Sequence, residues 1–296
     1  MAVYVTGDTH GADRLGHLSV DGFMNRLCST SFPEQKAMSK EDYVLILGDF
    51  GGVWDINREK CQESPREKEA LDWLEARPFT TLFVPGNHEN YDRLTGCRDE
   101  RLLSSWLYAS MPEHEKEKLR HGYPCLPFQG GMVRAVRPSV LMLERGDIFT
   151  LSGKSFFAFG GARSHDISGG VLYPPDYPDE AVLQQAFRQH PRGTVRIQGC
   201  SFWEQEMPDK DEMVRGKERL KQYLESHEKI DFIVTHDAPS SDKALLGMID
   251  RNELSVYLDE IAYMAPHGMW LYGHLHDNRK VLPNHILLYE QILRIV

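Results

Sequence analysis

The sequence predicts an α/β protein whose mainly parallel sheet carries a functional site at one edge. Two observations support this class. Apolar runs alternate with helical segments over residues 1–90, which is typical of strand–helix–strand units. Five apolar runs along the chain are each followed at once by a cluster that contains Asp, Asn or His, and open α/β sheets bind ligands at the carboxyl ends of their strands.

The N-terminal third contains the clearest of these elements. Strands are expected at 2–8, 43–47 and 80–84, and helices within 12–40 and at 64–77. The second strand is continuously apolar, which suits a sheet covered on both faces. Ser64 and Glu67 form a capping box that begins the helix before the third strand, and Pro78 ends it.

The rest of the chain is expected to add a second sheet. Short β segments are expected at 132–136, 139–143, 147–151 and 155–160, helices at 209–227 and 253–264, strands at 231–235 and 269–273, and a β-hairpin at 279–295. The four short segments are interpreted as an antiparallel meander in that second sheet. The Gly-, Pro- and aromatic-rich stretch 162–208 is too long for a simple connection, so we expect an insertion that faces the substrate. No linker divides the chain, and we expect one domain over 1–296.

Composition narrows the function classes. The 296 residues carry a formal charge of −10, which argues against stable binding of long nucleic acids. The five cysteines form no C-x-x-C pair, which argues against a disulfide framework or a zinc ribbon. No signal peptide and no apolar run long enough for a membrane span are evident. A cytoplasmic location is therefore expected.

The clusters that follow the apolar runs share one chemical character. They are Gly7–Gly11, Gly48–Gly52, Gly86–Glu89, Thr235–Asp237 and Gly273–His276. If the five loops meet at one sheet edge, they bring together carboxylate, amide and imidazole side chains: Asp8, His10, Asp49, Asn87, His236, His274 and His276. This set is too large for one tetrahedral zinc ion. It suits two divalent ions such as Mn, Fe, Zn or Co, joined by a shared carboxylate.

The charge balance of such a site points to phosphate chemistry. Two divalent ions against two carboxylates leave a net charge of about +2, so a water that bridges them becomes a hydroxide nucleophile near neutral pH. A hydrolysis of this kind also needs a proton donor for the leaving oxygen. His88 is left over from the ligand set and titrates in the right range, so we expect it to act as the general acid.

The motifs together resemble a known family. D-x-H, G-D-x-x-G, G-N-H-E, a lone His after a strand and G-H-x-H occur in the order found in calcineurin-like metallophosphoesterases, over residues 8–276. The resemblance implies a four-layered α/β/β/α sandwich with two mixed sheets, the metals at the strand ends and Asp49 as the bridging ligand. It assigns Asp8, His10, Asp49 and His276 to one metal and Asp49, Asn87, His236 and His274 to the other, with Mn favoured. His88 would be the general acid or a hydrogen-bond donor to the phosphate.

The second motif departs from that of the Ser/Thr protein phosphatases in this superfamily. Gly52 stands where they have a partner Asp, and the Arg that clamps phosphate is absent. The chain is therefore not a close relative of that subgroup. The residue that orients His88 is open, and Asp55 and Glu89 are the candidates.

Three residues are candidates for substrate binding. Arg14 and Arg163 could replace the missing arginine, and His165 lies in the same segment as Arg163. Arg14 also fits a surface position at a helix start, and 160–166 also fits a plain turn leaving a strand. The adjacent residues 164–166 are no sign of a Ser/His/Asp triad, because triads form between residues distant in sequence.

The leading prediction is metal-dependent hydrolysis of phosphate esters. The expected partners are a phosphorylated small molecule, a nucleotide or a phosphoprotein. A phosphodiesterase or nuclease that acts on nucleotides or nucleic acid, and a non-catalytic metal-binding protein, are the alternatives. The H-x-H-x-D-H motif of metallo-β-lactamases is absent, which argues against hydrolysis of other bonds.

Overall fold

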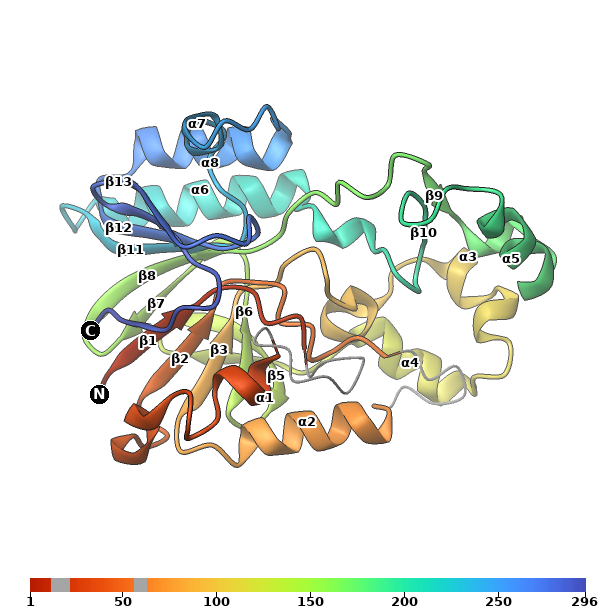
Figure 1. Ribbon diagram of the computed structural model, residues 1–296, viewed down its shortest axis with the longest axis horizontal. Helices are drawn as coiled ribbons and strands as arrows, with labels where there is room; N and C mark the ends of the chain where they lie inside the picture. Colours follow the sequence, from red (N-terminus) through yellow and green to blue (C-terminus); the bar gives the residue numbers. More distant parts are fainter. Residues whose placement is uncertain (12–21, 56–62) are drawn as a thin grey trace.

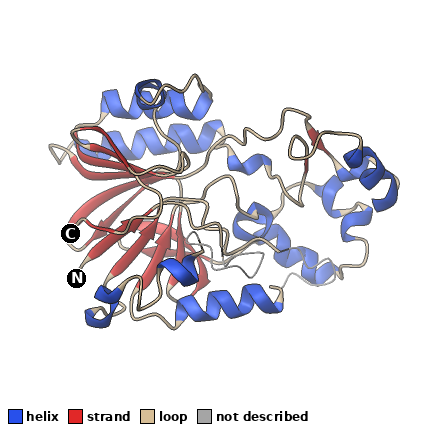
Figure 2. Cartoon of the chain, viewed as in Figure 1, coloured by secondary structure: helices blue, strands red, loops and turns tan. Residues whose placement is uncertain are grey.

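Two β-sheets lie face to face between two layers of helices in a computed structural model that describes residues 1–11, 22–55 and 63–296 (Figures 1 and 2). The first sheet has the order β15-β1-β2-β3-β6-β5-β4 and the second β13-β14-β12-β11-β8-β7. The first sheet consists of β15 (Leu293–Arg294), β1 (Val3–Thr6), β2 (Tyr43–Ile46), β3 (Thr80–Phe83), β6 (Val140–Leu143), β5 (Gly131–Arg137) and β4 (Cys125–Phe128). The second consists of β13 (Arg279–Leu282), β14 (His285–Leu287), β12 (His267–Tyr272), β11 (Ile230–Thr235), β8 (Lys154–Phe159) and β7 (Asp147–Leu151).

Parallel pairing dominates the centre of each sheet. Strands β1, β2, β3 and β6 are parallel neighbours in the first sheet, as are β8, β11, β12 and β14 in the second. Antiparallel strands form the edges, so both sheets are mixed. The C-terminal ends of β1, β2 and β3 therefore share one edge of the first sheet, and those of β11 and β12 share one edge of the second.

Three apolar layers hold the sandwich together. The central layer joins the inner faces of both sheets, for example Leu45 with Phe156 and Val234. The helices α1 (Phe23–Arg26) and α2 (Pro65–Glu75) cover the outer face of the first sheet. The helices α6 (Lys210–Leu224), α7 (Ser240–Leu245) and α8 (Glu253–Met264) lie over the outer face of the second. The predicted four-layered arrangement is thus confirmed. No helix among the described residues has the length and apolar character needed to cross a membrane.

The expected meander is wrong, because its four strands are divided between the two sheets. β6 is buried on both faces, so it needs a covered position, and it extends the parallel part of the first sheet beside β3. The chain then crosses to the second sheet at Gly146, where φ is +81°. The hairpin at the C-terminus is also shorter than expected: β13 and β14 form it, and β15 returns to the first sheet to pair with β1.

Only half of the expected capping box forms on α2. The Ser64 hydroxyl accepts a hydrogen bond from the N–H of Glu67. The Glu67 carboxylate instead accepts hydrogen bonds from the backbone of Trp54 and Asp55 and pairs with Arg93 at 2.5 Å. Tertiary partners thus replace the local contact that the sequence predicts.

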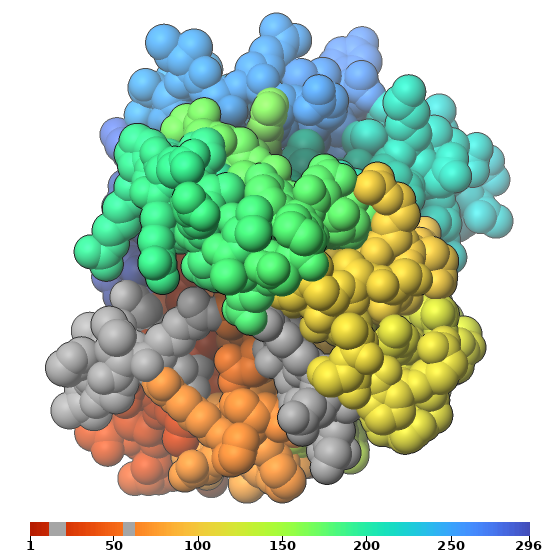
Figure 3. Space-filling view, turned by 90° about the vertical axis from the view of Figure 1, so that its right-hand side faces the viewer, coloured from red at the N-terminus to blue at the C-terminus, as the bar shows by residue number. Residues whose placement is uncertain are grey.

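A side lobe, defined as residues 97–122 and 162–208, lies beside the sandwich (Figure 1). The first part contains α3 (Glu100–Leu103), η3 (Trp106–Tyr108) and α4 (Glu113–His121). The second contains β9 (Val171–Leu172), η4 (Pro174–Asp176), α5 (Glu180–Arg188), β10 (Arg196–Ile197) and η5 (Glu204–Glu206). The two parts lie against each other in Figure 3, one in yellow and the other in green, and share a small core. The predicted insertion at 162–208 is therefore only one of two segments that build the lobe.

Candidate metal centre

All five predicted clusters follow directly on strand ends and lie close together. β1, β2, β3, β11 and β12 end one to four residues before the side chains concerned. The ligand atoms of Asp8, His10, Asp49 and His276 lie within 4.8 Å of one another, and so do those of Asp49, His236 and His274. Asp49 belongs to both groups. The two groups correspond to the two ligand sets that the sequence predicts, apart from Asn87.

The first group is more open to solvent than the second. Oδ2 of Asp8 lies 3.0 Å from Nε2 of His276 and 3.9 Å from Nε2 of His10. Nδ1 of His10 lies 3.9 Å from Oδ2 of Asp49. The two imidazole Nε2 atoms are themselves only 3.0 Å apart. Burial lowers the pKa of His10, which favours the neutral ring that metals bind.

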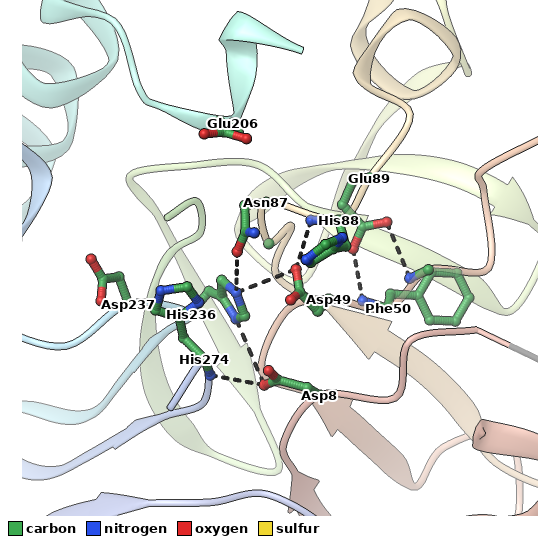
Figure 4. Close-up of polar contacts among 12 residues, drawn as sticks. Asp8, Asp49, Phe50, Asn87, His88, Glu89, Glu206, His236, Asp237 and His274 are labelled. Carbon is green, nitrogen blue, oxygen red and sulfur yellow. Dashed lines mark hydrogen bonds and ion pairs between the residues drawn. The ribbon is translucent and has the colours of Figure 1, made fainter. Parts of the chain in front are cut away.

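The second group is built around His236. Its Nδ1 lies 2.7 Å from the carbonyl oxygen of Leu47, which can only accept, so Nδ1 carries a proton. Its Nε2 faces Oδ1 of Asn87 at 3.2 Å and Oδ1 of Asp49 at 3.3 Å (Figure 4). Asn87 thereby joins the second group. A carbonyl that fixes the tautomer of a ligating imidazole is a common partner in metal sites.

The electrostatics of this group favour a cation. Burial disfavours the charged ring of His236, but Asp49 and Asp8 outweigh it and raise its pKa to about 10. The two carboxylates thus favour positive charge in the space between His236 and the oxygens that face it. His274 behaves differently, because burial and the neighbouring His236 hold its pKa well below the usual value. The donor set of carboxylate, amide and imidazole fits divalent ions of borderline hardness.

Each aspartate is anchored through one oxygen. Oδ1 of Asp49 accepts a hydrogen bond of 2.8 Å from the N–H of His88, and Oδ1 of Asp8 accepts one of 2.9 Å from the N–H of His274. Gly86 and Gly273 make these approaches possible, since a Cβ on either would lie 2.1 or 2.2 Å from the same oxygen atoms. Oδ2 of Asp8 is buried and faces Nε2 of His276 at 3.0 Å. The loops thus hold each carboxylate through Oδ1 and leave Oδ2 facing a histidine of the first group.

The backbone is strained at this centre. Six non-glycine residues in the described chain have positive φ, and four of them are predicted ligands: His10 (48°), Asp49 (42°), His274 (68°) and His276 (49°). The other two, Gln129 and Ser152, lie in hairpin turns. Left-handed backbone at side chains of this size is uncommon and concentrates at functional sites.

His88 lies at the rim of the two groups. Its ring is 5.4 Å from that of His10 and 6.0 Å from that of Trp54, measured between centroids. Neither expected partner is seen to orient it. Glu89 is buried and accepts from the N–H groups of Phe50 and Gly51, and Asp55 accepts from Ser64. Glu89 therefore supports the loop that carries Asp49, and burial raises its pKa well above the usual value.

The substrate-binding candidates have different outcomes. Arg14 lies outside the described residues. Arg163 and His165 are exposed, and the His165 ring lies 5.9 Å from that of His274. Sequence reasoning missed Arg196 in β10, which pairs with Asp166 and is close enough to His88 to lower the pKa of that ring. An arginine so far along the chain from every motif gave no local signal.

One of two comparisons with known proteins finds a match, and that match agrees with this geometry. A search of curated proteins finds no match. The profile of the family described as calcineurin-like phosphoesterase matches residues 1–278, which include every predicted ligand. The chain therefore belongs to the calcineurin-like phosphoesterase family, whose activity is metal-dependent hydrolysis of phosphate esters.

Proposed function

We propose that the protein hydrolyses phosphate esters at a dinuclear metal centre. Asp8, His10, Asp49 and His276 would hold one ion, and Asp49, Asn87, His236 and His274 the other. The observation that carries the proposal is the pair of ligand groups that share Asp49. When bound, the ions polarise the phosphoryl group and generate a hydroxide nucleophile near neutral pH. Mn²⁺ suits the mixed oxygen and nitrogen donors and is the favoured ion.

We assign the proton-donor role to His88. It is the one imidazole of the Gly86–Glu89 loop, and its backbone is fixed by the hydrogen bond to Asp49. Burial lowers the pKa of His88, and Arg196 lowers it further, whereas Asp49 and Asp8 raise it. Once protonated, such a ring gives up its proton readily, which suits transfer to a leaving oxygen.

We propose small phosphate esters as the substrate class, with nucleotides first among them. The side lobe stands beside the strand ends that carry the ligands (Figure 1). Arg196 would contact the phosphate, because Asp166 pairs with its guanidinium and the charge is close enough to His88 to lower the pKa of that ring. The formal charge of −10 supports a small anion attracted by local positive charge over a long polyanion.

The test is turnover by metal-free protein reloaded with Mn²⁺. p-Nitrophenyl phosphate and bis-p-nitrophenyl phosphate are compared at equal metal content. Hydrolysis of the first alone would define a phosphomonoesterase, and preference for the second a phosphodiesterase. Two bound ions per chain without hydrolysis of either, or of a nucleotide panel, would contradict the proposal and favour the non-catalytic alternative.

A further inference from the structure

We infer that Ser164 and Glu206 of the side lobe are positioning residues that fix the amide of Asn87 and thereby complete the second metal site. The inference rests on the proposed dinuclear centre. It concerns a hydroxyl and a carboxylate that belong to none of the five motifs. Both side chains are buried, with exposed fractions of 7% for Ser164 and 2% for Glu206.

A chain of hydrogen bonds runs from the lobe to the ligand. Oε1 of Glu206 accepts from the N–H of Ser164 at 2.7 Å, and Oε2 accepts from its Oγ at 2.7 Å. The same Oγ accepts from Nδ2 of Asn87 at 3.4 Å. Oδ1 of Asn87 then faces Nε2 of His236 at 3.2 Å. Figure 4 shows Glu206 on the side of Asn87 that faces away from Asp8.

The direction of these bonds decides which end of the amide faces the metal. An ionised carboxylate only accepts, so the Ser164 hydroxyl donates its single proton to Glu206. Its lone pairs are then directed to Asn87 and select the NH₂ end of the amide. The carbonyl oxygen of Asn87 is left to face His236 and the second metal site, which is the orientation that a ligand needs.

The neighbouring backbone is held by the same lobe segment. The Tyr91 hydroxyl donates to the carbonyl oxygen of Gly86 at 2.6 Å, and Nη2 of Arg145 donates to that hydroxyl at 2.8 Å. The same Nη2 lies 2.7 Å from the carbonyl oxygen of Gln205 and 3.1 Å from that of Glu206. The end of the lobe is therefore connected to the backbone of Gly86 through the buried side chains of Arg145 and Tyr91. It contacts the amide of Asn87 through Ser164.

The experiment is Mn²⁺ titration of metal-free protein, followed by EPR, which distinguishes an isolated ion from a coupled pair. Burial raises the pKa of Glu206 to about 7, so the titration is run well above that value, where the carboxylate is ionised. In Ser164→Ala, the affinity for the second ion should fall by about 10-fold or more, the usual effect of losing a hydrogen-bond partner of a ligand. The affinity for the first ion should stay unchanged.

Ser139→Ala is the matched control. Ser139 is equally buried, at 6%, and donates its N–H and Oγ to Glu75 at 2.9 and 2.8 Å, remote from the predicted ligands. It should bind both ions like the parent. Glu206→Gln provides a second variant that keeps the side-chain volume. Its amide can accept only one of the two protons from Ser164, so the hydroxyl is freed to donate and the Asn87 amide is biased toward the wrong orientation.

The outcomes separate this inference from the proposed function. Selective loss of the second ion in Ser164→Ala and Glu206→Gln, but not in Ser139→Ala, would support the positioning role. Unchanged second-ion affinity in both lobe variants would overturn it and leave the dinuclear centre intact. Parent protein that binds no coupled pair would overturn the centre and the positioning role together.

Discussion

The strand-end loops and the side lobe are held in place by different kinds of contact. In the loops, each predicted ligand lies within a few residues of a strand, and short backbone hydrogen bonds anchor the carboxylates. The contacts made by the lobe join residues that are far apart in sequence: Tyr173 and Asp99 lie 2.7 Å apart within it, and Trp203 contacts Asp92 of the sandwich at 3.0 Å. The loops therefore hold the predicted ligands by local contacts, and the lobe is held by contacts between distant segments of the chain.

The comparison also shows where the two regions depend on each other. The lobe has its own apolar core, but Glu206 and Ser164 connect it to Asn87. On this division, loss of a ligand in the loops should abolish metal binding, and loss of a core side chain in the lobe should destabilise the lobe alone. The four predictions below test this division, from the largest expected effect to the smallest.

Asp49→Asn should remove the dinuclear centre. Asp49 is shared by both ligand groups, and His236, His88 and His10 hold its pKa well below the usual value against the effect of burial. We expect neither ion to bind tightly. The rate of hydrolysis should fall by well over about 100-fold, which is the upper end of the loss when a residue that only hydrogen-bonds to a metal ligand is mutated. Metal content and turnover provide the measurement. Asp42→Asn, at the opposite end of β2, should retain both, and intact metal content in Asp49→Asn would refute the assignment.

His88→Ala should slow turnover without loss of metal. A general acid contributes about 10²- to 10⁴-fold, and its loss matters most when the leaving group is a poor one. The decrease in kcat should therefore be larger for an alkyl phosphate than for p-nitrophenyl phosphate. An equal decrease for both substrates would instead assign His88 to phosphate binding, and no decrease would remove it from the mechanism.

Leu103→Ala should destabilise the side lobe alone. Leu103 is buried in the lobe core, and a cavity of this kind costs about 2 to 5 kcal/mol. Hydrogen exchange should accelerate in α3 and α5 while the central strands stay protected. Leu82→Ala, buried between the two sheets, is the matched change in the sandwich and should accelerate exchange throughout. If Leu103→Ala gave the global pattern too, the lobe would not be a separate stability unit.

Asp92→Asn should change how stability depends on pH. Burial raises the pKa of Asp92 from 3.8 to about 6 where the lobe joins the sandwich. A raised carboxyl pKa contributes stability below the unfolded value of 3.8 that is lost as pH rises through about 6. The parent should therefore lose up to about 3 kcal/mol relative to Asp92→Asn over this range. Urea unfolding of metal-free protein measures the difference, and parallel pH profiles of the two proteins would contradict the prediction.

The sequence predicts which side chains lie together at the strand ends far better than it predicts the pairing of the strands. Predicted ligands such as Asp8 and His274 lie in clusters that immediately follow apolar strands, so local pattern suffices to place them. The position of β6 depends on its burial beside β3, which no local signal encodes. Ser164 and Glu206 lack a signal for the same reason, because Ser164 bonds Asn87 from 77 residues away along the chain and Glu206 bonds Ser164 from 42 residues away.

Left-handed backbone reduces the stability of the fold at four predicted metal ligands: His10, Asp49, His274 and His276. Glycine at any of these positions would relieve about 1 to 3 kcal/mol of strain while it deletes the side chain of a predicted metal ligand. Glycine should therefore become enriched at these four positions when a library of variants is selected for thermal stability alone, with a chelator present to remove metal. Repeating the selection with Mn²⁺ present should reverse the enrichment, so the functional residues could be identified without knowledge of the substrate.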